Sequence, residues 1–431
     1  MRRPHQIAAA GVLWALMLLP CLALAQDTSD SASGAPEALS GEKPQMNGFK
    51  IGPGRLHIFL TEGLAYNSAA IVVPNTTGNY TVEGELILHT RPGFNLEIDG
   101  DNNTFGMNGY IDYLWYTGLI TPGDNYLSTL YAGADLHGAF NKNGVVGFNI
   151  IDTFSRSTNT YTVSVPVGVI SLYNLVGVEV PIRPGGRALE IIPHGSYAVE
   201  LFQNYSGGAP PGSTAPQDLT QYNYQDLIGG LDVRLKFLPE TAFMFWSSYN
   251  APIYSQPQLN PEAQLLKLQV GLAGLITTKL STLLKVGWVQ GFGSGAISTV
   301  IGQAEVTWLP TELASLTVGF LRDVYPVAGN GSYVDDRPYL TGKIFMSGRL
   351  SLSLTAAYDF FDFALGNPAP NPTPSRNDTQ LTLNFVADYQ VTRWFIVGAG
   401  LLFTYHTSSQ STNNALNYTQ WQPYVQVTFT Y

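Results

Sequence analysis

The sequence has only one cysteine, Cys21, and it lies in an apolar run from Ile7 to Leu24. If that run is removed, the mature chain has no thiol. This fits an oxidising compartment and excludes a fold that depends on a disulfide framework.

The apolar run follows Arg2 and Arg3 and ends in the small-residue site around Ala25, after which the chain becomes polar. A basic start, an apolar middle and a small-residue exit are typical of a secretory signal peptide. We therefore predict a signal peptide over residues 1–25. A retained membrane anchor is the weaker alternative, because the polar segment "QDTSDSASG" follows directly.

Charged residues are also scarce, at 12% of the chain, whereas soluble domains average about 25%. Removing residues 1–25 takes away two arginines and no acid, which leaves a formal charge of −12. A basic patch for nucleic acid is therefore not expected. The shortage of charge predicts either an unusually large core or a surface that does not face water.

Long apolar runs are absent after the signal segment: no uncharged apolar stretch reaches the 18 residues or so that a membrane helix needs. The longest candidate is interrupted by Lys267, Lys279 and Lys285. A closed β-barrel is the other structure that satisfies all backbone groups in lipid. The low charge and the missing helices together predict a transmembrane antiparallel up-and-down β-barrel.

The remaining chain contains segments of about ten residues that alternate apolar and polar side chains, as barrel strands do. We predict eighteen strands, with sixteen or twenty as alternatives because the register of the first half is blurred. A soluble β-sandwich or propeller is the alternative fold. The predicted strands start near Arg55, Glu83, Met107, Leu127, Val145, Val169, Leu189, Gln225, Thr241, Leu265, Leu280, Thr299, Leu313, Pro338, Leu350, Thr379, Trp394 and Trp421.

The connections alternate in length from the eighth predicted strand on. Short joints such as "LPE", "TTK" and "SGR" alternate with long polar loops such as "NAPIYSQPQLNPE", "VYPVAGNGSYVDDR" and "ALGNPAPNPTPSRND". Outer-membrane barrels have short periplasmic turns and long extracellular loops. We therefore predict an outer-membrane protein of a Gram-negative bacterium with both termini in the periplasm.

Three regions follow: a signal peptide at 1–25, a flexible periplasmic tail at 26–52 and the barrel at 53–431. The tail is rich in Ser, Ala, Gly and Pro and cannot bury a core. It is too short for the plug domain of a TonB-dependent transporter, which excludes that class.

Signs of catalysis are missing. The chain has no Gly-x-Ser-x-Gly elbow and no His-x-x-x-His pair. We predict that the protein is not an enzyme and holds no metal and no cofactor. Weak calcium binding by Asp335 and Asp336, placed in a loop, is the one metal alternative.

Strand parity predicts which side chains line the pore. The early strands contribute acidic residues and the later strands basic ones, diluted by Asp232, Glu305, Asp359 and Asp388. This arrangement would set a transverse field across an aqueous channel. The predicted pore-lining residues are Glu83, Glu85, His89, Asp112, Asp135, Glu179, Glu190, Glu200, Arg234, Lys236, Lys267, Lys285 and Lys343. Inward tyrosines predicted either to stack on sugar rings or to fill space are Tyr110, Tyr131, Tyr173, Tyr339 and Tyr424.

The final stretch, "WQPYVQVTFTY", alternates apolar and polar residues and ends on an aromatic. We predict that it is a barrel strand whose apolar face contacts lipid and whose edge pairs with the first strand around Arg55. Phe429 and Tyr431 are predicted to form the signal that the barrel assembly machinery reads.

The second half resembles the β-barrel porins that accompany exopolysaccharide and capsule synthesis systems. The resemblance covers about Gln225 to Tyr431 and is carried by the runs "GGLDVRLKFLPETAFMFWSSYNAPIY", "TTKLSTLLKVGW" and "AEVTWLPTELASLTVGFLRDVYP". It implies a conduit for a secreted polysaccharide. The partners it implies are a periplasmic polysaccharide export protein without its own outer-membrane span and an inner-membrane copolymerase.

The resulting hypothesis is an outer-membrane porin that conducts a polysaccharide. The alternatives are a general diffusion or small-solute porin and, less favoured, a non-conducting adhesin or structural barrel.

Overall fold

The computed structural model describes residues 48–74, 80–120, 128–159, 169–185, 188–203, 219–238, 240–260, 262–327, 331–364, 376–409 and 417–431. The predicted signal peptide and most of the predicted tail lie outside these residues.

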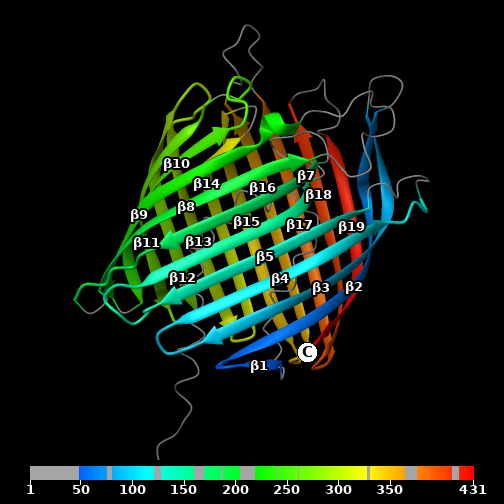
Figure 1. Ribbon diagram of the computed structural model, residues 1–431, viewed down its shortest axis with the longest axis horizontal. Helices are drawn as coiled ribbons and strands as arrows, with labels where there is room; N and C mark the ends of the chain where they lie inside the picture. The colour runs from blue at the N-terminus through cyan, green and yellow to red at the C-terminus, as the bar shows by residue number, and fades with distance from the viewer. Residues whose placement is uncertain are drawn as a thin grey trace, which may run out of the picture.

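Eighteen long strands, β2 to β19, form one antiparallel sheet in which each strand pairs with its neighbour in sequence and β19 pairs with β2. The sheet is therefore a closed barrel (Figure 1). Closure leaves neither β2 nor β19 with an unpaired edge. The strands are β1 (Phe49–Ile51), β2 (Gly54–Pro74), β3 (Tyr80–Asp99), β4 (Thr104–Tyr116), β5 (Thr129–Phe140), β6 (Phe148–Asn159), β7 (Val169–Glu179), β8 (Leu189–Gln203), β9 (Tyr224–Leu238), β10 (Thr241–Tyr254), β11 (Gln264–Thr277), β12 (Leu280–Phe292), β13 (Thr299–Thr311), β14 (Ala314–Val327), β15 (Gly331–Met346), β16 (Leu350–Phe363), β17 (Asn377–Thr392), β18 (Phe395–Ser408) and β19 (Tyr418–Thr430).

The predicted barrel and its strand number are confirmed. Seventeen of the eighteen predicted starts lie within three residues of the observed ones. The exception is Pro338, because β15 begins at Gly331. The segment predicted as a loop around Val324 to Arg337 is mostly an extension of the β14–β15 hairpin, and its Val and Tyr residues suit extended backbone.

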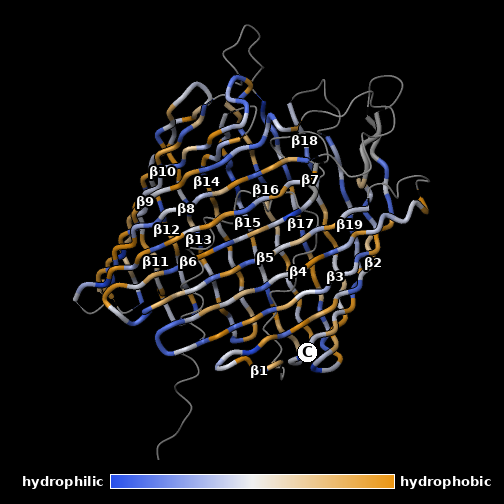
Figure 2. Tube along the Cα trace, viewed as in Figure 1, coloured by the Kyte–Doolittle hydropathy of each residue, from blue (hydrophilic) through white to orange (hydrophobic). Residues whose placement is uncertain are grey.

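Alternation along the strands sets the two faces of the wall, and Figure 2 shows hydrophobic and hydrophilic residues alternating along them. In β19, Gln422 and Gln426 are buried while Trp421 and Val425 are exposed. Polar side chains therefore point inward and apolar ones outward, as predicted for the C-terminal stretch.

The two ends of the barrel differ. At the end that holds β1 and the C-terminus (Figure 1), five of the connections are the two- or three-residue joints 239–240, 278–279, 312–313, 347–349 and 393–394. The opposite end has longer connections such as 204–223 and 364–376. The short 3-10 helix η2 (Leu219–Tyr222) belongs to the first of these.

One boundary differs from the prediction. Phe49–Ile51 fall in the predicted tail, yet they form β1 and pair with the start of β2, with Phe49 opposite Leu56. The ring of Phe49 also lies 4.9 Å from the ring of Tyr431. These contacts join residues 49–51 to the barrel wall.

The outer wall is apolar on nearly every strand. Large exposed side chains include Leu64, Trp115, Val286, Trp308 and Phe385, each at least 38% exposed. Such a continuous apolar surface would not be stable in water. With aromatic residues toward both ends of the wall, it is the architecture of outer-membrane barrels.

No helix among the described residues is long and apolar enough to cross a membrane.

Candidate functional site

The inward face of the barrel is the candidate site. Side chains opposite each other in the register share a face, so the pairs fix which residues point inward. The predicted pore-lining residues all occupy inward positions: Glu83, Glu85, His89, Asp112, Asp135, Glu179, Glu190, Glu200, Arg234, Lys236, Lys267, Lys285 and Lys343.

On the β3–β4 wall, Asp112 is bound by a residue that the sequence reading missed. Arg91 Nε and Nη2 donate to Asp112 Oδ2 at 2.8 and 2.6 Å. His89 Nδ1 lies 3.5 Å from Asp112 Oδ1, and the Arg91 guanidinium lies 4.8 Å from the centre of the Tyr110 ring. This wall therefore carries a compensated charge cluster around the predicted inward acid Asp112.

Two of the predicted acids, Glu85 and Glu200, accept hydrogen bonds from neighbouring groups of the chain. Glu85 is fully buried and accepts hydrogen bonds from Thr117 Oγ1 at 2.9 Å and from the Ile120 amide at 3.4 Å. Glu200 accepts from Ser171 Oγ and Tyr224 Oη, both at 2.6 Å. Glu85 therefore does not line open water, which corrects the prediction for that residue.

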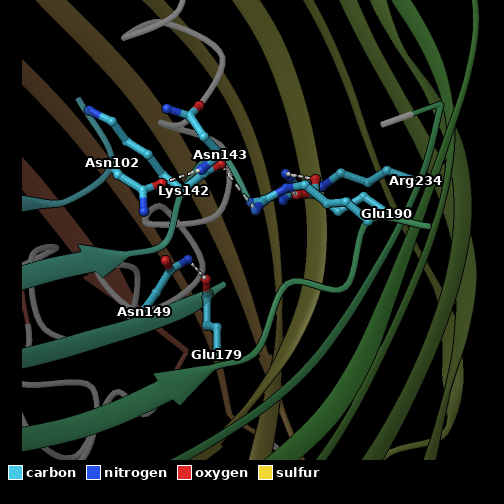
Figure 3. A network of polar contacts seen from close by, with 8 residues as sticks. Asn102, Lys142, Asn143, Asn149, Glu179, Glu190 and Arg234 are labelled. Atoms are coloured by element: carbon cyan, nitrogen blue, oxygen red, sulfur yellow. Dashed lines mark hydrogen bonds and ion pairs between the residues drawn. The ribbon is translucent and has the colours of Figure 1, made fainter. Parts of the chain in front are cut away.

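At the end with the short turns, Glu190 joins two arginines (Figure 3). Arg183 Nε donates to Glu190 Oε1 at 2.6 Å, and Arg234 Nη1 lies 3.5 Å from Glu190 Oε2. Arg183 Nη1 also donates to the Lys142 carbonyl at 3.3 Å. Nearby, Asn149 Nδ2 donates to Glu179 Oε2 at 3.0 Å. These bonds tie the β5–β6 and β7–β8 connections to the inner wall.

The largest departure from a simple barrel is at the end with the long loops. Strand β14 pairs with β13 only as far as Arg322, opposite Gly302, and then continues to Val327 paired with β15 alone. We call residues Asp323–Val327 and Gly331–Asp336 the inner hairpin. Its second strand is tied to the β12–β13 connection, since Ser332 Oγ donates to the Gly295 carbonyl at 2.8 Å and accepts from the Ile297 amide at 3.0 Å.

The inner hairpin packs against the inside of the wall. Val324 and Val334 form a buried cluster with Leu265, Val289 and Ile301, which are inward residues of β11, β12 and β13. The opposite side of the hairpin, with Tyr325, Val327 and Tyr333, packs on Phe361 and Phe363 of β16. The hairpin is therefore a second layer inside the barrel, and it narrows the lumen at this end.

Charged residues connect the inner hairpin to the wall. Lys267 Nζ lies 2.8 Å from Asp323 Oδ1, and Arg337 Nη2 lies 2.8 Å from Asp335 Oδ2. Arg337 also pairs with Asp359 on β16.

Next along the wall, Arg376 pairs with Asp378, and His406 Nε2 lies 3.6 Å from the same carboxylate. The Arg376 guanidinium stands 4.5 Å from the centre of the Phe363 ring. Acids and bases thus alternate around the lumen at the level of the hairpin.

The remaining predicted lysines lie against aromatic rings or at the rim. Lys285 Nζ is 5.2 Å from the Trp246 ring centre and Lys343 Nζ is 4.7 Å from that of Phe345. Lys236 is exposed beside the bulge between Thr241 and Ala242.

The predicted opposition of an acidic and a basic wall needs correction. Arg91 lies on the predicted acidic side, and Asp323, Asp335 and Asp378 lie on the predicted basic side. Acids nevertheless outnumber bases on the inward face. Among the described residues, the inward acids are Glu83, Glu85, Glu97, Asp99, Asp112, Asp135, Glu179, Glu190, Glu200, Asp226, Asp232, Glu305, Asp323, Asp335, Asp359, Asp378 and Asp388, and the bases are Arg55, Arg91, Arg234, Lys236, Lys267, Lys285, Arg337, Lys343 and Arg376.

The predicted sugar-stacking tyrosines all point inward, but three of them offer no open ring face. Tyr131, Tyr173 and Tyr424 are only 6–7% exposed. Tyr173 packs with Leu175 and Ala198. Of the two roles predicted for these tyrosines, the burial of these three rings favours filling space over stacking on a sugar. Tyr339 Oη donates to Glu305 Oε2 at 2.6 Å and the Tyr110 ring lies beside Arg91, so both belong to polar clusters.

Asp335 and Asp336 are strand residues of β15, not loop residues as predicted. Asp335 points inward to Arg337, and Asp336 Oδ2 points outward to Arg322 Nη1 at 2.5 Å. Arginine occupies both carboxylates, which argues against the calcium alternative. Within the part of the chain that the structure describes, no three His, Cys, Asp or Glu side chains are grouped to hold a metal ion.

No protein-family profile matches the chain, and no curated protein matches it in sequence. Several solved structures are similar in fold. OccAB4 from Acinetobacter baumannii is 11% identical, with coverage of 90% of this chain and 100% of that one and a TM-score of 0.44. OccAB3 from the same organism is 9% identical, with coverage of 88% and 100% and a TM-score of 0.45. The siderophore receptor PirA from Pseudomonas aeruginosa is 11% identical, with coverage of 88% and 80% and a TM-score of 0.41. Likeness at this level does not indicate what this chain transports.

Proposed function

We propose that the protein is an outer-membrane porin that conducts a polysaccharide out of the cell, with both termini in the periplasm. The fold supports a conduit because an apolar wall encloses a polar inward face. The single observation that carries the proposal is the inner hairpin, which forms a constriction at the end with the long loops.

The constriction is suited to regulate passage of a chain. Its two faces are apolar, its flanks are ion-paired, and its second strand is held by the hydrogen bonds of Ser332. A polymer wider than the remaining lumen would need the hairpin to swing toward β16, to which it stays paired through Tyr333 and Phe363. Polar groups and ion pairs on the lumen wall would then exchange hydrogen bonds with sugar hydroxyls.

The resemblance to exopolysaccharide porins is the support for polysaccharide as cargo. It implies that a periplasmic export protein and an inner-membrane copolymerase deliver the polymer to the short-turn end. At that end Arg183 links Glu190 to the Lys142 carbonyl, and Figure 3 shows Glu190 and Lys142 in this network.

A small-solute porin is the second candidate, favoured by the same constriction if the hairpin is fixed.

Uptake of oligosaccharides into liposomes that contain the purified barrel distinguishes the two functions. A conduit for polymer should admit oligosaccharides longer than those that pass general porins, whereas a small-solute porin should exclude them.

The test in cells is deletion of the gene, followed by staining and compositional analysis of surface polysaccharides. Loss of one polymer from the surface, with its accumulation in the periplasm, is the expected result. A strain that displays every surface polysaccharide at the wild-type level would refute polysaccharide export.

A further inference from the structure

The outer wall has two groups of polar side chains at positions that face lipid. The first group is Glu62 on β2 with Thr90 on β3, and Glu62 stands between the exposed Leu60 and Leu64. The second group is Asp152 and Arg156 on β6 with Asn174 on β7. The other charged pair on the outer wall, Arg322 with Asp336, lies where the inner hairpin leaves the wall.

In both groups the carboxylate accepts a hydrogen bond from a neutral donor, which does not balance its charge. Thr90 Oγ1 donates to Glu62 Oε2 at 2.7 Å, and Asn174 Nδ2 donates to Asp152 Oδ1 at 2.8 Å. Arg156 Nη1 reaches the neutral Thr129 Oγ1 at 3.5 Å, the limit of a hydrogen bond, so the guanidinium charge also lacks an acidic partner among these contacts. One neutral donor does not offset the charge of a carboxylate in contact with acyl chains, because hydrocarbon supplies no counter-charge. Something other than lipid tails is therefore expected to cover these two patches.

The Glu62 group lines a depression in the outer wall of about 620 Å³. Apolar and aromatic side chains surround the carboxylate, among them Leu64, Tyr113, Trp115, Val425 and Val427. An acid in an aromatic-walled hollow is suited to a guanidinium group, which both pairs with carboxylates and stacks on aromatic rings.

We propose that copies of this chain pack side by side in the membrane, with Arg156 of one copy entering the Glu62 depression of the next. The argument for a second copy is charge complementarity: the same wall carries an acid in a hollow and a cation on a nearby strand. The two patches are different, so the contact is heterologous. They are four strands apart in a closed sheet of eighteen, which corresponds to about 80° around the barrel and favours a ring of three or four copies over an open filament.

Cysteine cross-linking tests the contact. Leu64→Cys lines the depression, and Phe154→Cys lies between Asp152 and Arg156. Oxidation of outer membranes that contain the double variant should give a ladder of covalent multimers that ends at the ring size. Each single variant should give none, because a heterologous contact does not bring identical residues together. The matched control is Leu268→Cys with Phe385→Cys, two outward positions with 44% and 43% exposure on other parts of the wall.

A charge exchange provides the second measurement. Glu62→Arg alone or Arg156→Glu alone should make the purified protein monomeric in detergent, and the combination of the two should restore the multimer. Light scattering measures the molar mass in each case. Heat-modifiable migration on gels verifies that each variant is folded. A wild-type protein that is monomeric in detergent and in nanodiscs, with no ladder from the double cysteine variant, would overturn the proposal. Bound phospholipid on that monomer in native mass spectrometry would then identify lipid as the occupant. This test does not depend on the cargo, so its failure leaves the proposed transport function intact.

Discussion

Lys267 Nζ and Asp323 Oδ1 lie 2.8 Å apart, although strands β12 and β13 separate β11 from β14 in the sheet. Neighbouring strands are spaced at about 4.8 Å, so three steps along a simple wall would separate the two positions by about 14 Å. The ion pair exists because β14 leaves the wall after Arg322 and turns into the lumen. It therefore reports directly on the position of the inner hairpin.

We expect Lys267→Met to loosen the inner hairpin and raise the single-channel conductance in planar bilayers. The substitution leaves Asp323 without its cation while it is only 6% exposed. Removal of one partner of a buried pair costs about 3–5 kcal/mol, which the protein can avoid if the hairpin moves toward water. Asp323→Asn should act in the same direction.

The exchanged pair, Lys267→Asp with Asp323→Lys, is the matched control, since it keeps the charges and reverses their positions. Its conductance should return toward the wild-type value. If both single variants conduct like the wild type, the inner hairpin does not limit the channel.

A disulfide should lock the hairpin. We expect Ala296→Cys with Ser332→Cys to oxidise readily, because Ser332 Oγ already contacts the residues on both sides of Ala296. If a polymer passes only when the hairpin swings, the oxidised protein should block polysaccharide display and a reductant should restore it. Conductance to small ions should change little. Normal display with the disulfide formed would show that the polymer does not need this movement.

Much of the barrel could be predicted from the sequence. A strand with lipid on one side and water on the other must alternate apolar and polar residues, and this alternation is visible in the sequence. In β19 each outward residue is apolar or exposed and each inward one except Thr430 is buried, so the pattern of "WQPYVQVTFTY" is unambiguous. The ends of β14 and β15 were harder to predict. Neither Tyr325 nor Tyr333 indicates whether a hairpin extends beyond the membrane or folds into the lumen.

The site was harder to predict because partners come from distant strands. Parity placed Asp112 and Lys267 on the inward face, but Asp323 was read as the last residue before a loop, and Arg91 was not recognised as the partner of Asp112. The alternation of Asp335, Arg337 and Tyr339 was a usable signal, had that segment been read as a strand. The burial of Tyr131 and Tyr424 depends on packing in three dimensions, which no local pattern encodes.

We expect the open channel to prefer cations, because acids outnumber bases on the inward face. The reversal potential in a salt gradient measures this preference. Lys267→Glu with Lys285→Glu should increase the cation preference further, since both lysines point inward and Lys285 is only 8% exposed. Lys142→Glu, which makes the same charge change in the β5–β6 connection at the short-turn end, is the control. Equal reversal potentials for the double variant and the wild type would contradict a lumenal role for these two lysines.

Gly319 provides space for a lumenal side chain. A Cβ atom there would meet the ring of Tyr339, which lies across the glycine. We expect Gly319→Val to displace the ring from Glu305 and destabilise the barrel by about 1–3 kcal/mol, as overpacking usually does. Urea unfolding in detergent, followed by tryptophan fluorescence, measures the change. Gly229→Val is the matched control, because no atom lies within 4 Å of a Cβ at that strand position; equal unfolding midpoints for both variants would contradict the steric argument.

Phe429 packs the last barrel strand, β19, against β18 and the turn that precedes it. Its ring stacks on Phe395 at 5.1 Å and on Trp394 at 6.2 Å, and the next residues join β2 through Tyr431 N, which donates to the Ile58 carbonyl at 2.9 Å. Each aromatic pair contributes about 0.5–1.5 kcal/mol beyond burial. Phe429→Ala should therefore cost about 1–3 kcal/mol and lower the temperature at which the folded band disappears on gels. Phe385→Ala is the matched control. It removes a lipid-facing ring that is 43% exposed, against 40% for Phe429, from a strand away from the C-terminus. Because lipid contact is similar in the two cases, a larger loss for Phe429→Ala isolates the contribution of the stacked rings between β19 and β18, and an equal loss would show that these rings add nothing to stability.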